Sequence, residues 1–213
     1  MMTISRRRFG WGLALALIAQ LALVGGAARP ASAEPAQTIV LAGGCFWGME
    51  AVFGDLKGVK EAMPGYSGGA ASTAHYEMVS TGTTGHAESV RVTYDPAQIS
   101  LAQILNVYFT VAHDPTELNR QGPDDGTQYR SAIFVANADQ RAEAKAEIDR
   151  LTAEHRFSAP IVTKLETFKA FYPAEAYHRH YAALHPDDMY IVINDAPKVA
   201  ALKKTYPQLV APK

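Results

Sequence analysis

Residues 38–48 read T-I-V-L-A-G-G-C-F-W-G, and this stretch sets the beginning of the fold. The apolar, β-branched run 38–42 predicts a short buried strand, which the pair Gly43-Gly44 ends. Apolar side chains at helical spacing over 46–56 predict a helix directly afterwards. The unit is therefore a strand, a tight turn, a cysteine and a helix, with Cys45 at the start of the helix.

Outward from this unit, the chain continues with strands and helices in the order β-α-β, β-α-β, α-β. Strands are expected over 59–66, 88–94, 130–136 and 161–167, and helices after an N-cap at Ser100, over 139–155 and over 175–184. Loops are expected over 70–85 and 113–127, and coil after 184 with one helical piece at 200–204. This order predicts an α+β fold with a mixed sheet, a ferredoxin-like core and a long irregular C-terminal tail.

The first 33 residues have the pattern of a secretory signal. A basic segment, S-R-R-R-F at 5–9, precedes an uncharged stretch over 10–28, and Ala31-Ser32-Ala33 supplies small residues for a signal peptidase. The paired arginines are typical of a twin-arginine export signal. We expect cleavage after Ala33, a periplasmic protein and a single domain over 34–213. A retained membrane anchor is the alternative.

Composition excludes several classes of protein. The 213 residues are 48% hydrophobic and 19% charged, which is globular composition. One cysteine excludes a disulfide framework. Loss of the first 33 residues removes four arginines and leaves 16 basic against 21 acidic residues, a formal net charge of −5. Such a charge argues against partners that are nucleic acids or anionic membranes.

Cys45 is the strongest candidate for a nucleophile. The backbone N–H groups and dipole at a helix start stabilise negative charge, so this position is expected to favour a thiolate. The alternative is a buried core cysteine, which is common for free thiols. A spare thiol in an oxidising compartment is a liability, which favours the functional interpretation.

Phe46 and Trp47 are expected to form an apolar wall beside Cys45, suited to a methyl group. Two adjacent aromatic residues cannot both face the core side of one helix, so at least one is expected to flank the thiol. The alternative is that both are core residues.

Three further kinds of side chain complete the candidate site. Glu88 begins a strand and is a candidate proton donor if an apolar wall raises its pKa; otherwise it is a solvated strand-end carboxylate. Tyr76 and Tyr129 lie at loop edges, where a phenol can point its O–H into a site. Asp124 is a further candidate in a turn where an Asp commonly bonds its own backbone.

The sequence contains no motif for binding a metal or a nucleotide cofactor. His178, His180 and His185 lack the spacing of metal ligands, and no G-x-G-x-x-G or P-loop is present. We therefore expect neither a metal nor a nucleotide cofactor.

Ordered sequence blocks resemble one known family, the A-type peptide methionine sulfoxide reductases. The blocks cover about 39–186 and are G-C-F-W-G at 44–48, G-Y-S-G-G at 65–69, H-Y at 75–76, S-T-G at 80–82, T-G-H-A-E at 84–88, H-D-P-T at 113–116, D-D-G-T-Q-Y-R-S at 124–131, and Y-H at 177–178 with Tyr181. The resemblance implies a two-layer α/β sandwich with a rolled mixed sheet.

The resemblance also implies a reaction and a role for each matching residue. Cys45 would attack the sulfur of a methionine S-sulfoxide, in oxidised proteins and peptides and in the free amino acid. Glu88 would protonate the sulfoxide oxygen. The remaining positions would hold the substrate: Tyr76 and Tyr129 at the oxygen, Phe46 and Trp47 at the S-methyl group, and Asp124 at the peptide backbone.

A single cysteine sets this chain apart from many members of the family. One position at which relatives carry a second cysteine is Ser80 here, and the C-terminal tail has none. The sulfenic acid left on Cys45 is therefore expected to be reduced by an external thiol, a thioredoxin-like protein or dithiothreitol. A monomer is expected.

Three other functions are weighed beside the reductase. A cysteine hydrolase would use His86 or His113 as base and would tolerate loss of the Glu88 carboxylate. An exported binding protein for oxidised methionine would react once and never turn over. A thiol peroxidase would not need the aromatic methyl pocket.

Overall fold

The computed structural model describes residues 1–3 and 35–212. The expected cleavage site at Ala33, and all but the first three residues of the expected signal segment, lie outside the described residues. Internal contacts separate Met1–Ser32 from Ala33–Lys213, and the fold below is that of the second unit. Among the described residues, no helix has the length and apolar character to cross a bilayer.

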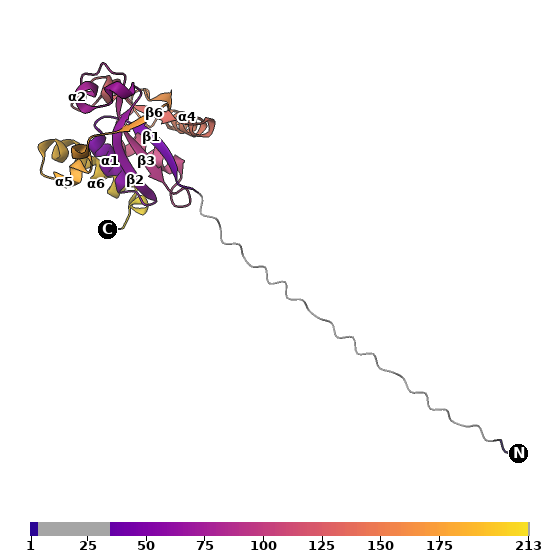
Figure 1. Ribbon diagram of the computed structural model, residues 1–213. Helices are drawn as coiled ribbons and strands as arrows, with labels where there is room; N and C mark the ends of the chain where they lie inside the picture. The colour runs from indigo at the N-terminus through magenta and orange to yellow at the C-terminus, as the bar shows by residue number, and fades with distance from the viewer. Residues whose placement is uncertain (4–34, 213) are drawn as a thin grey trace. The chain divides into compact units, whose positions relative to one another are not determined.

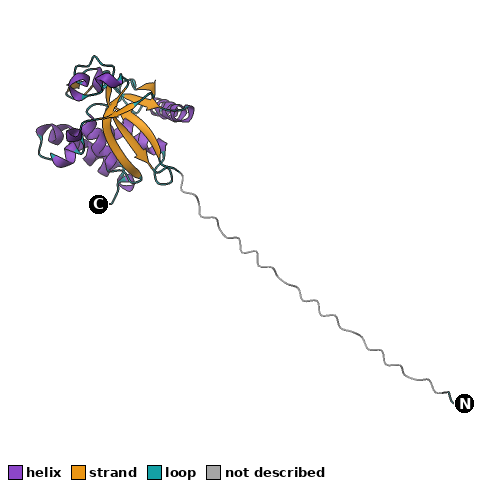
Figure 2. Ribbon diagram, viewed as in Figure 1, coloured by secondary structure: helices purple, strands orange, loops and turns teal. Residues whose placement is uncertain are grey.

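Four antiparallel strands form the ferredoxin-like core. They lie in the order β6-β1-β3-β2, with bounds β1 Gln37–Ala42, β2 Val59–Ser67, β3 Ala87–Tyr94 and β6 Ala132–Val135. β1 and β2 both run antiparallel to β3 between them, which makes a split β-α-β unit. Two edge strands complete a mixed six-stranded sheet (Figure 2), β7 Lys164–Thr167 parallel to β6 and β8 Phe171–Pro173 antiparallel to β2. The predicted α+β fold with a mixed sheet is confirmed.

Helices cover one face of the sheet. The main core joins strand side chains to helices that include α1 Phe46–Gly54, α3 Leu101–Val107 and α4 Ala138–Ala153. Val90, Val92 and Tyr94 of β3 point into this core. Because strand side chains alternate between faces, Glu88 points to the same side, toward α1. The other face carries a smaller cluster with Phe134, against which Phe168 and Phe171 pack.

The predicted N-cap at Ser100 is confirmed in detail. Its Oγ accepts the N–H of Gln103 at 3.2 Å, and the Gln103 side chain accepts the N–H of Ser100 at 3.0 Å, a capping box. α3 then widens into a π-helical turn, η2 Tyr108–Ala112. Apolar side chains at helical spacing after this cap are buried: Leu101, Ile104, Leu105, Tyr108 and Phe109.

The C-terminal tail is more helical than expected. A π-helical turn, η5 Ile191–Asp195, leads into α6 Ala196–Thr205, and η6 Pro207–Leu209 follows. Pro197 lies in the first turn of α6. Ile191 and Leu202 are buried and anchor this segment. The helical piece predicted at 200–204 is confirmed within α6, and the prediction of coil over 191–199 is wrong. Figure 1 shows α6 beside α1.

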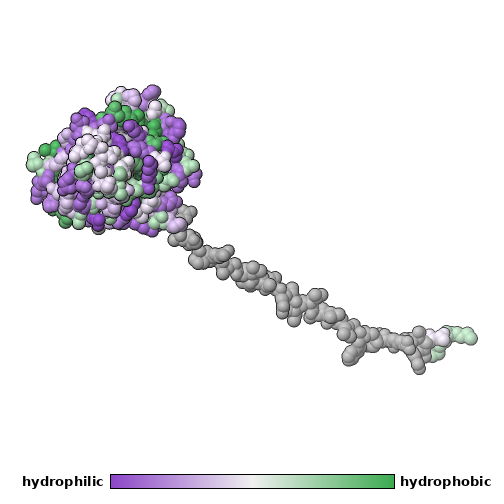
Figure 3. Space-filling model, turned by 45° about the horizontal axis from the view of Figure 1, so that its top comes forward, coloured by the Kyte–Doolittle hydropathy of each residue, from purple (hydrophilic) through white to green (hydrophobic). Residues whose placement is uncertain are grey.

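Smaller elements also differ from the expectation. The helix predicted over 175–184 is interrupted at Arg179 and His180, where His180 has a φ of 55°, and becomes η4 Ala176–His178 and α5 Tyr181–Leu184. The two predicted loops contain short structure: η1 Ala71–Thr73, α2 Tyr76–Val79, β4 Arg120–Gln121, β5 Asp124–Asp125 and η3 Thr127–Tyr129. On the face drawn in Figure 3, hydrophilic side chains predominate and apolar ones form smaller patches.

Candidate active site

One cavity of about 340 Å³ brings together the seven residues to which the sequence resemblance assigns roles. It is lined by Cys45, Phe46, Trp47, Tyr76, Glu88, Asp124, Tyr129, Asp188 and Tyr190. These residues come from the start of α1, the start of α2, β3, β5, η3 and the segment before η5. A larger cavity of about 460 Å³ lies on the Glu50 side of α1 and shares Trp47 with the first. The smaller cavity holds the thiol and is the candidate active site.

The two glycines before Cys45 are required by close packing. Gly44 has a φ of +92°, and a Cβ there would lie 2.5 Å from Cγ of Gln121. A Cβ at Gly43 would lie 2.7 Å from Cγ of His113. Only glycine fits both positions, so the chain turns sharply and leaves Cys45 as the N-cap of α1.

The Cys45 thiol is more buried than the sequence suggested, with only 8% of the residue exposed. Burial raises the pKa of the thiol well above its ordinary value, and the carboxylates of Glu88, Asp195 and Asp124 raise it further. The backbone N–H of Trp47 acts in the opposite direction. The expectation that the helix start favours a thiolate is therefore wrong for the resting site, because loss of hydration outweighs one amide hydrogen bond.

Glu88 is buried rather than solvated, with 2% of the residue exposed. Its Oε2 accepts the backbone N–H of Phe46 at 3.1 Å. Burial raises the pKa of this carboxyl to about 8; the Phe46 amide lowers it, and Asp124 and Asp195 raise it. At neutral pH the carboxyl therefore carries a proton, as a general acid requires.

Tyr76 and Tyr129 add two phenols to the cavity. Burial, followed by the negative charge of Glu88, raises the pKa of both hydroxyls, so both remain protonated donors. Glu175 fixes the backbone at Tyr76, because its Oε1 accepts the Tyr76 N–H at 2.9 Å. The other oxygen of Glu175 accepts the hydroxyl of Tyr66 at 2.7 Å.

The aromatic wall is built by stacking on the C-terminal segment. The indole of Trp47 stacks on Tyr181 with ring centroids 3.8 Å apart and 11° between the planes. Its Nε1 donates to Nδ1 of His178 at 3.1 Å. Phe46 is buried, packs against the His178 ring at 4.9 Å and also lines the cavity. The two aromatic residues therefore serve the core and the cavity together.

Asp188 and Tyr190 are lining residues that sequence reasoning missed. The hydroxyl of Tyr190 donates to Asp124, so Asp124 is more than a turn residue. Asp188 accepts the Tyr190 N–H at 2.8 Å and the Tyr181 hydroxyl at 3.1 Å. The turn signal H-P-D-D at 185–188 precedes Tyr190 and marks where the chain returns to the cavity.

The two histidines considered as bases have other partners. In His86, Nδ1 accepts the Gly69 N–H at 3.2 Å and Nε2 donates to the Ala70 carbonyl at 3.0 Å. In His113, the ring nitrogens contact the Tyr108 carbonyl at 2.8 Å and Ser131 Oγ at 2.7 Å, and burial lowers its pKa to about 4. Neither histidine is among the described residues that line the cavity, which argues against a cysteine hydrolase.

Within residues 1–3 and 35–212, no three His, Cys, Asp or Glu side chains are grouped to hold a metal ion.

The protonated carboxyl, the two phenols and the thiol together form a site able to protonate an oxygen while sulfur attacks the atom that carries it.

Comparison with known proteins gives one consistent result. The family model described as "Peptide methionine sulfoxide reductase" matches residues 37–209. "Peptide methionine sulfoxide reductase MsrA 2" of Mesorhizobium japonicum is 54% identical over 182 residues, 85% of this chain and 93% of that protein.

Two solved structures share the fold. Mxr1 from Saccharomyces cerevisiae in reduced form has a TM-score of 0.66 and 34% identity, covering 71% of this chain and 87% of that one. Methionine sulfoxide reductase A of Corynebacterium diphtheriae has a TM-score of 0.61 and 34% identity, covering 71% of this chain and 76% of that one.

Proposed function

Because the chain belongs to the peptide methionine sulfoxide reductase family, we propose that Cys45 attacks the sulfoxide sulfur while Glu88 protonates the sulfoxide oxygen. The protein is an oxidoreductase that returns methionine sulfoxide to methionine and so repairs oxidised proteins. The observation that carries the assignment of roles is the buried Glu88 carboxyl, whose pKa of about 8 keeps a proton in the cavity that holds Cys45.

Glu88 acts as a proton relay between the thiol and the oxygen. As the sulfur of Cys45 bonds to the sulfoxide sulfur, the carboxyl gives its proton to the oxygen and takes up the thiol proton. The S–O bond of the substrate and the new S–S bond then break. The electron pair of the S–S bond stays on the methionine sulfur, and the hydroxyl group ends on Cys45 as a sulfenic acid. The substrate sulfur is reduced by two electrons and the cysteine sulfur is oxidised by two, so methionine leaves and Glu88 is again protonated.

The relay resolves the unfavourable electrostatics of the thiol. Burial disfavours a free thiolate in the resting cavity, and so do the charge that Glu88 carries once ionised and the charges of Asp195 and Asp124. Transfer of the thiol proton during attack avoids forming that thiolate in advance. The hydroxyls of Tyr76 and Tyr129 then donate to the oxygen, where negative charge develops.

The remaining lining residues orient the substrate. Phe46 and Trp47 face the S-methyl group, and the linked pair of Asp124 and Tyr190 binds the backbone of the methionine sulfoxide residue. The apolar wall lies opposite the groups that donate hydrogen bonds to the sulfoxide oxygen. The S-methyl group therefore faces the wall and the oxygen faces the donors, which fixes the configuration of the chiral sulfur. This arrangement supports selection of the S epimer, in peptides and in the free amino acid.

An external thiol completes the cycle. Cys45 is the only cysteine of the chain, and the residue at one position of a second cysteine in relatives is the exposed Ser80. A thiol condenses with the sulfenic acid to release water and form a mixed disulfide, and a second thiol then frees Cys45. The reductant is a dithiol, a thioredoxin-like protein in the cell or dithiothreitol in the test tube, without a further cofactor.

The chain acts as a monomer in the periplasm after cleavage behind Ala33. The order of basic, apolar and small residues in the first 33 positions supports export. N-terminal sequencing of the protein from a periplasmic fraction is expected to begin at Glu34, and light scattering is expected to give the mass of one chain. A mature N-terminus at Met1 or a dimeric mass would contradict these points.

The proposed function is tested by stoichiometry without reductant. Excess S-sulfoxide of an acetylated, amidated methionine is mixed with protein 34–213, and product and free thiol are counted. We expect one methionine product and one lost thiol per chain, and no product with Cys45→Ser. Dithiothreitol then restores turnover. Binding without product would assign the site to a binding protein, and consumption of peroxide but not sulfoxide would assign it to a peroxidase.

A further inference from the structure

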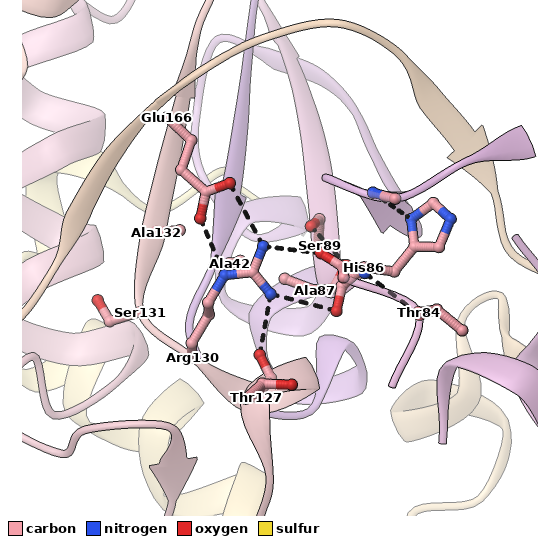
Figure 4. A network of polar contacts seen from close by, with 12 residues as sticks. Ala42, Thr84, His86, Ala87, Ser89, Thr127, Arg130, Ser131, Ala132 and Glu166 are labelled. Atoms are coloured by element: carbon pink, nitrogen blue, oxygen red, sulfur yellow. Dashed lines mark hydrogen bonds and ion pairs between the residues drawn. The ribbon is translucent and has the colours of Figure 1, made fainter. Parts of the chain in front are cut away.

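Arg130, the residue after Tyr129, uses all of the five N–H groups of its guanidinium (Figure 4). Nε donates to Glu166 Oε1 at 2.9 Å, and Nη2 donates to Glu166 Oε2 at 3.4 Å and to the Gly85 carbonyl at 3.1 Å. Nη1 donates to the carbonyls of Thr127 at 2.9 Å and His86 at 3.2 Å. Only 8% of Arg130 is exposed, so these contacts replace most of its hydration.

The contacts join the two segments that carry the proton donors. Thr127 belongs to η3, the short turn that ends at Tyr129. Gly85 and His86 directly precede β3, in which Glu88 lies two residues further on. One planar guanidinium therefore ties the backbone beside Tyr129 to the backbone beside Glu88.

The bridge extends to the segment that leads to Tyr76. The ring of His86 contacts the Gly69 N–H at 3.2 Å and the Ala70 carbonyl at 3.0 Å, and η1 and α2 follow at once in the chain. A Cβ at Gly68 would lie 2.8 Å from Arg130 Nη2 and 2.8 Å from the Gly85 carbonyl. The bridge is thus packed without spare space against the end of β2.

We propose that Arg130, held in orientation by Glu166, is a positioning residue that sets the spacing of Tyr129 and Glu88 around the sulfoxide oxygen. This inference rests on the proposed function. Neither Arg130 nor Glu166 is among the described residues that line the cavity, so they act through Tyr129 and Glu88. A guanidinium suits this task because its donors are fixed in one plane, whereas a lysine has three donors on a flexible stem.

The first test is Arg130→Lys, which keeps the positive charge and removes the planar set of guanidinium donors. In a single turnover without reductant, we expect methionine formation to slow about 10- to 100-fold, since small misplacements of catalytic groups have effects of this size. Alkylation of Cys45 by iodoacetamide is expected to keep its rate, because Arg130 does not contact α1 through any of its five bonds. Glu166→Gln, which preserves the shape, is expected to slow the reaction less.

Coupling to Tyr129 separates positioning from a merely structural role. With Tyr129→Phe as background, Arg130→Lys is expected to slow methionine formation at least about 3-fold less than in the unaltered protein, because only Glu88 remains of the two groups that Arg130 positions. Arg91→Lys is the matched control. Arg91 is half-buried and pairs with Glu61 at 3.5 Å on the sheet. The variant Arg91→Lys is expected to leave the rate of methionine formation unchanged in both backgrounds.

The outcomes are distinguishable from failure of the proposed function. No methionine from the unaltered protein would refute the proposed function itself. Two results would overturn the inference if the unaltered protein forms methionine normally. One is equal slowing by Arg130→Lys in both backgrounds, and the other is faster alkylation of Cys45. Either would show that Arg130 only stabilises the fold. If Arg130→Lys fails to fold, Glu166→Gln in the same two backgrounds decides in the same way.

Discussion

The backbone nitrogen of Phe46 lies 3.1 Å from Oε2 of Glu88, so the first N–H of helix α1 is used by the acid rather than by the thiol. The next N–H, that of Trp47, acts on Cys45. Consecutive amides of one helical turn thus hold the acid and the nucleophile. The acid and the nucleophile are both held by the first turn of α1, which fixes their separation without any direct bond between them.

Replacing Glu88 by Gln is expected to lower the rate of methionine formation about 100- to 10,000-fold, the range for loss of a general acid. In the unaltered protein this rate is expected to fall as pH rises through about 8, because Glu88 then loses its proton. Single turnovers followed from pH 6 to pH 10 measure both effects. Glu61→Gln, at a partly exposed carboxylate paired with Arg91, is the control. A rate that stays flat across pH 8 would exclude Glu88 as the acid.

The same carboxyl makes stability depend on pH. Its folded pKa is raised above the unfolded value, so its contribution to stability is complete below pH 4.5 and is lost as pH rises through about 8. Each unit of raised pKa corresponds to about 1.4 kcal/mol. Glu88→Gln is therefore expected to unfold like the unaltered protein in urea at pH 5 and to be more stable at pH 9. Equal stability at pH 9 would show that the ionised carboxylate is well solvated.

Asp195 is expected to restrain the reactivity of the thiol. It is fully buried, pairs with Lys198 at 3.1 Å and raises the pKa of Cys45. Asp195→Asn removes a like charge, so the pKa of Cys45 falls and alkylation by iodoacetamide at pH 7.5 accelerates. The pH dependence of that rate gives the shift directly.

The matched control for this charge is Asp55→Asn. Asp55 is the C-cap of α1, at the opposite end of the helix from Cys45, and pairs with Lys203 at 3.1 Å. The variant Asp55→Asn is expected to leave the pH dependence of Cys45 alkylation unchanged. An equal shift from both variants would assign the effect to the helix as a whole rather than to Asp195.

Tyr190→Phe removes the hydroxyl that donates to Asp124 at the cavity. We expect KM for a methionine sulfoxide peptide to rise about 10-fold, the equivalent of one hydrogen bond, with a smaller change in kcat. Tyr206→Phe loses a hydroxyl bonded to Asn106 at 2.8 Å and is expected to keep both constants. A fall in kcat alone for Tyr190→Phe would place this hydroxyl in the chemical step instead of in binding.

Local signals made much of the fold predictable. The strand–Gly-Gly–cysteine–helix unit, the strand expected over 88–94 and the cap at Ser100 all depend on neighbours in sequence, and the structure has each of them. The structure also gathers the residues singled out for chemistry at one cavity. Their roles stay predictions for the experiments above.

What the sequence did not reveal depends on contacts between distant segments. The pKa of Cys45 is raised by burial, by Glu88 and by Asp195, the last of which is 150 positions away, and no local pattern at a helix start contains that information. Tyr190 reaches Asp124 because the tail folds back on α1, which buried Ile191 and Leu202 anchor. The sequence predicted only the part of α6 at 200–204, and the first residues of the helix, around Pro197, were predicted as coil.

The stacking of Trp47 on Tyr181 has an optical consequence. The chain has two tryptophans, and Trp11 lies in the first 33 residues, so a protein that begins at residue 34 carries a single indole. That indole lines the cavity of the thiol and donates to His178. Its fluorescence therefore comes from one emitter beside the reacting sulfur. Substrate binding, the sulfenic acid and the mixed disulfide each change its surroundings, and rapid mixing can follow the whole cycle in real time without a label.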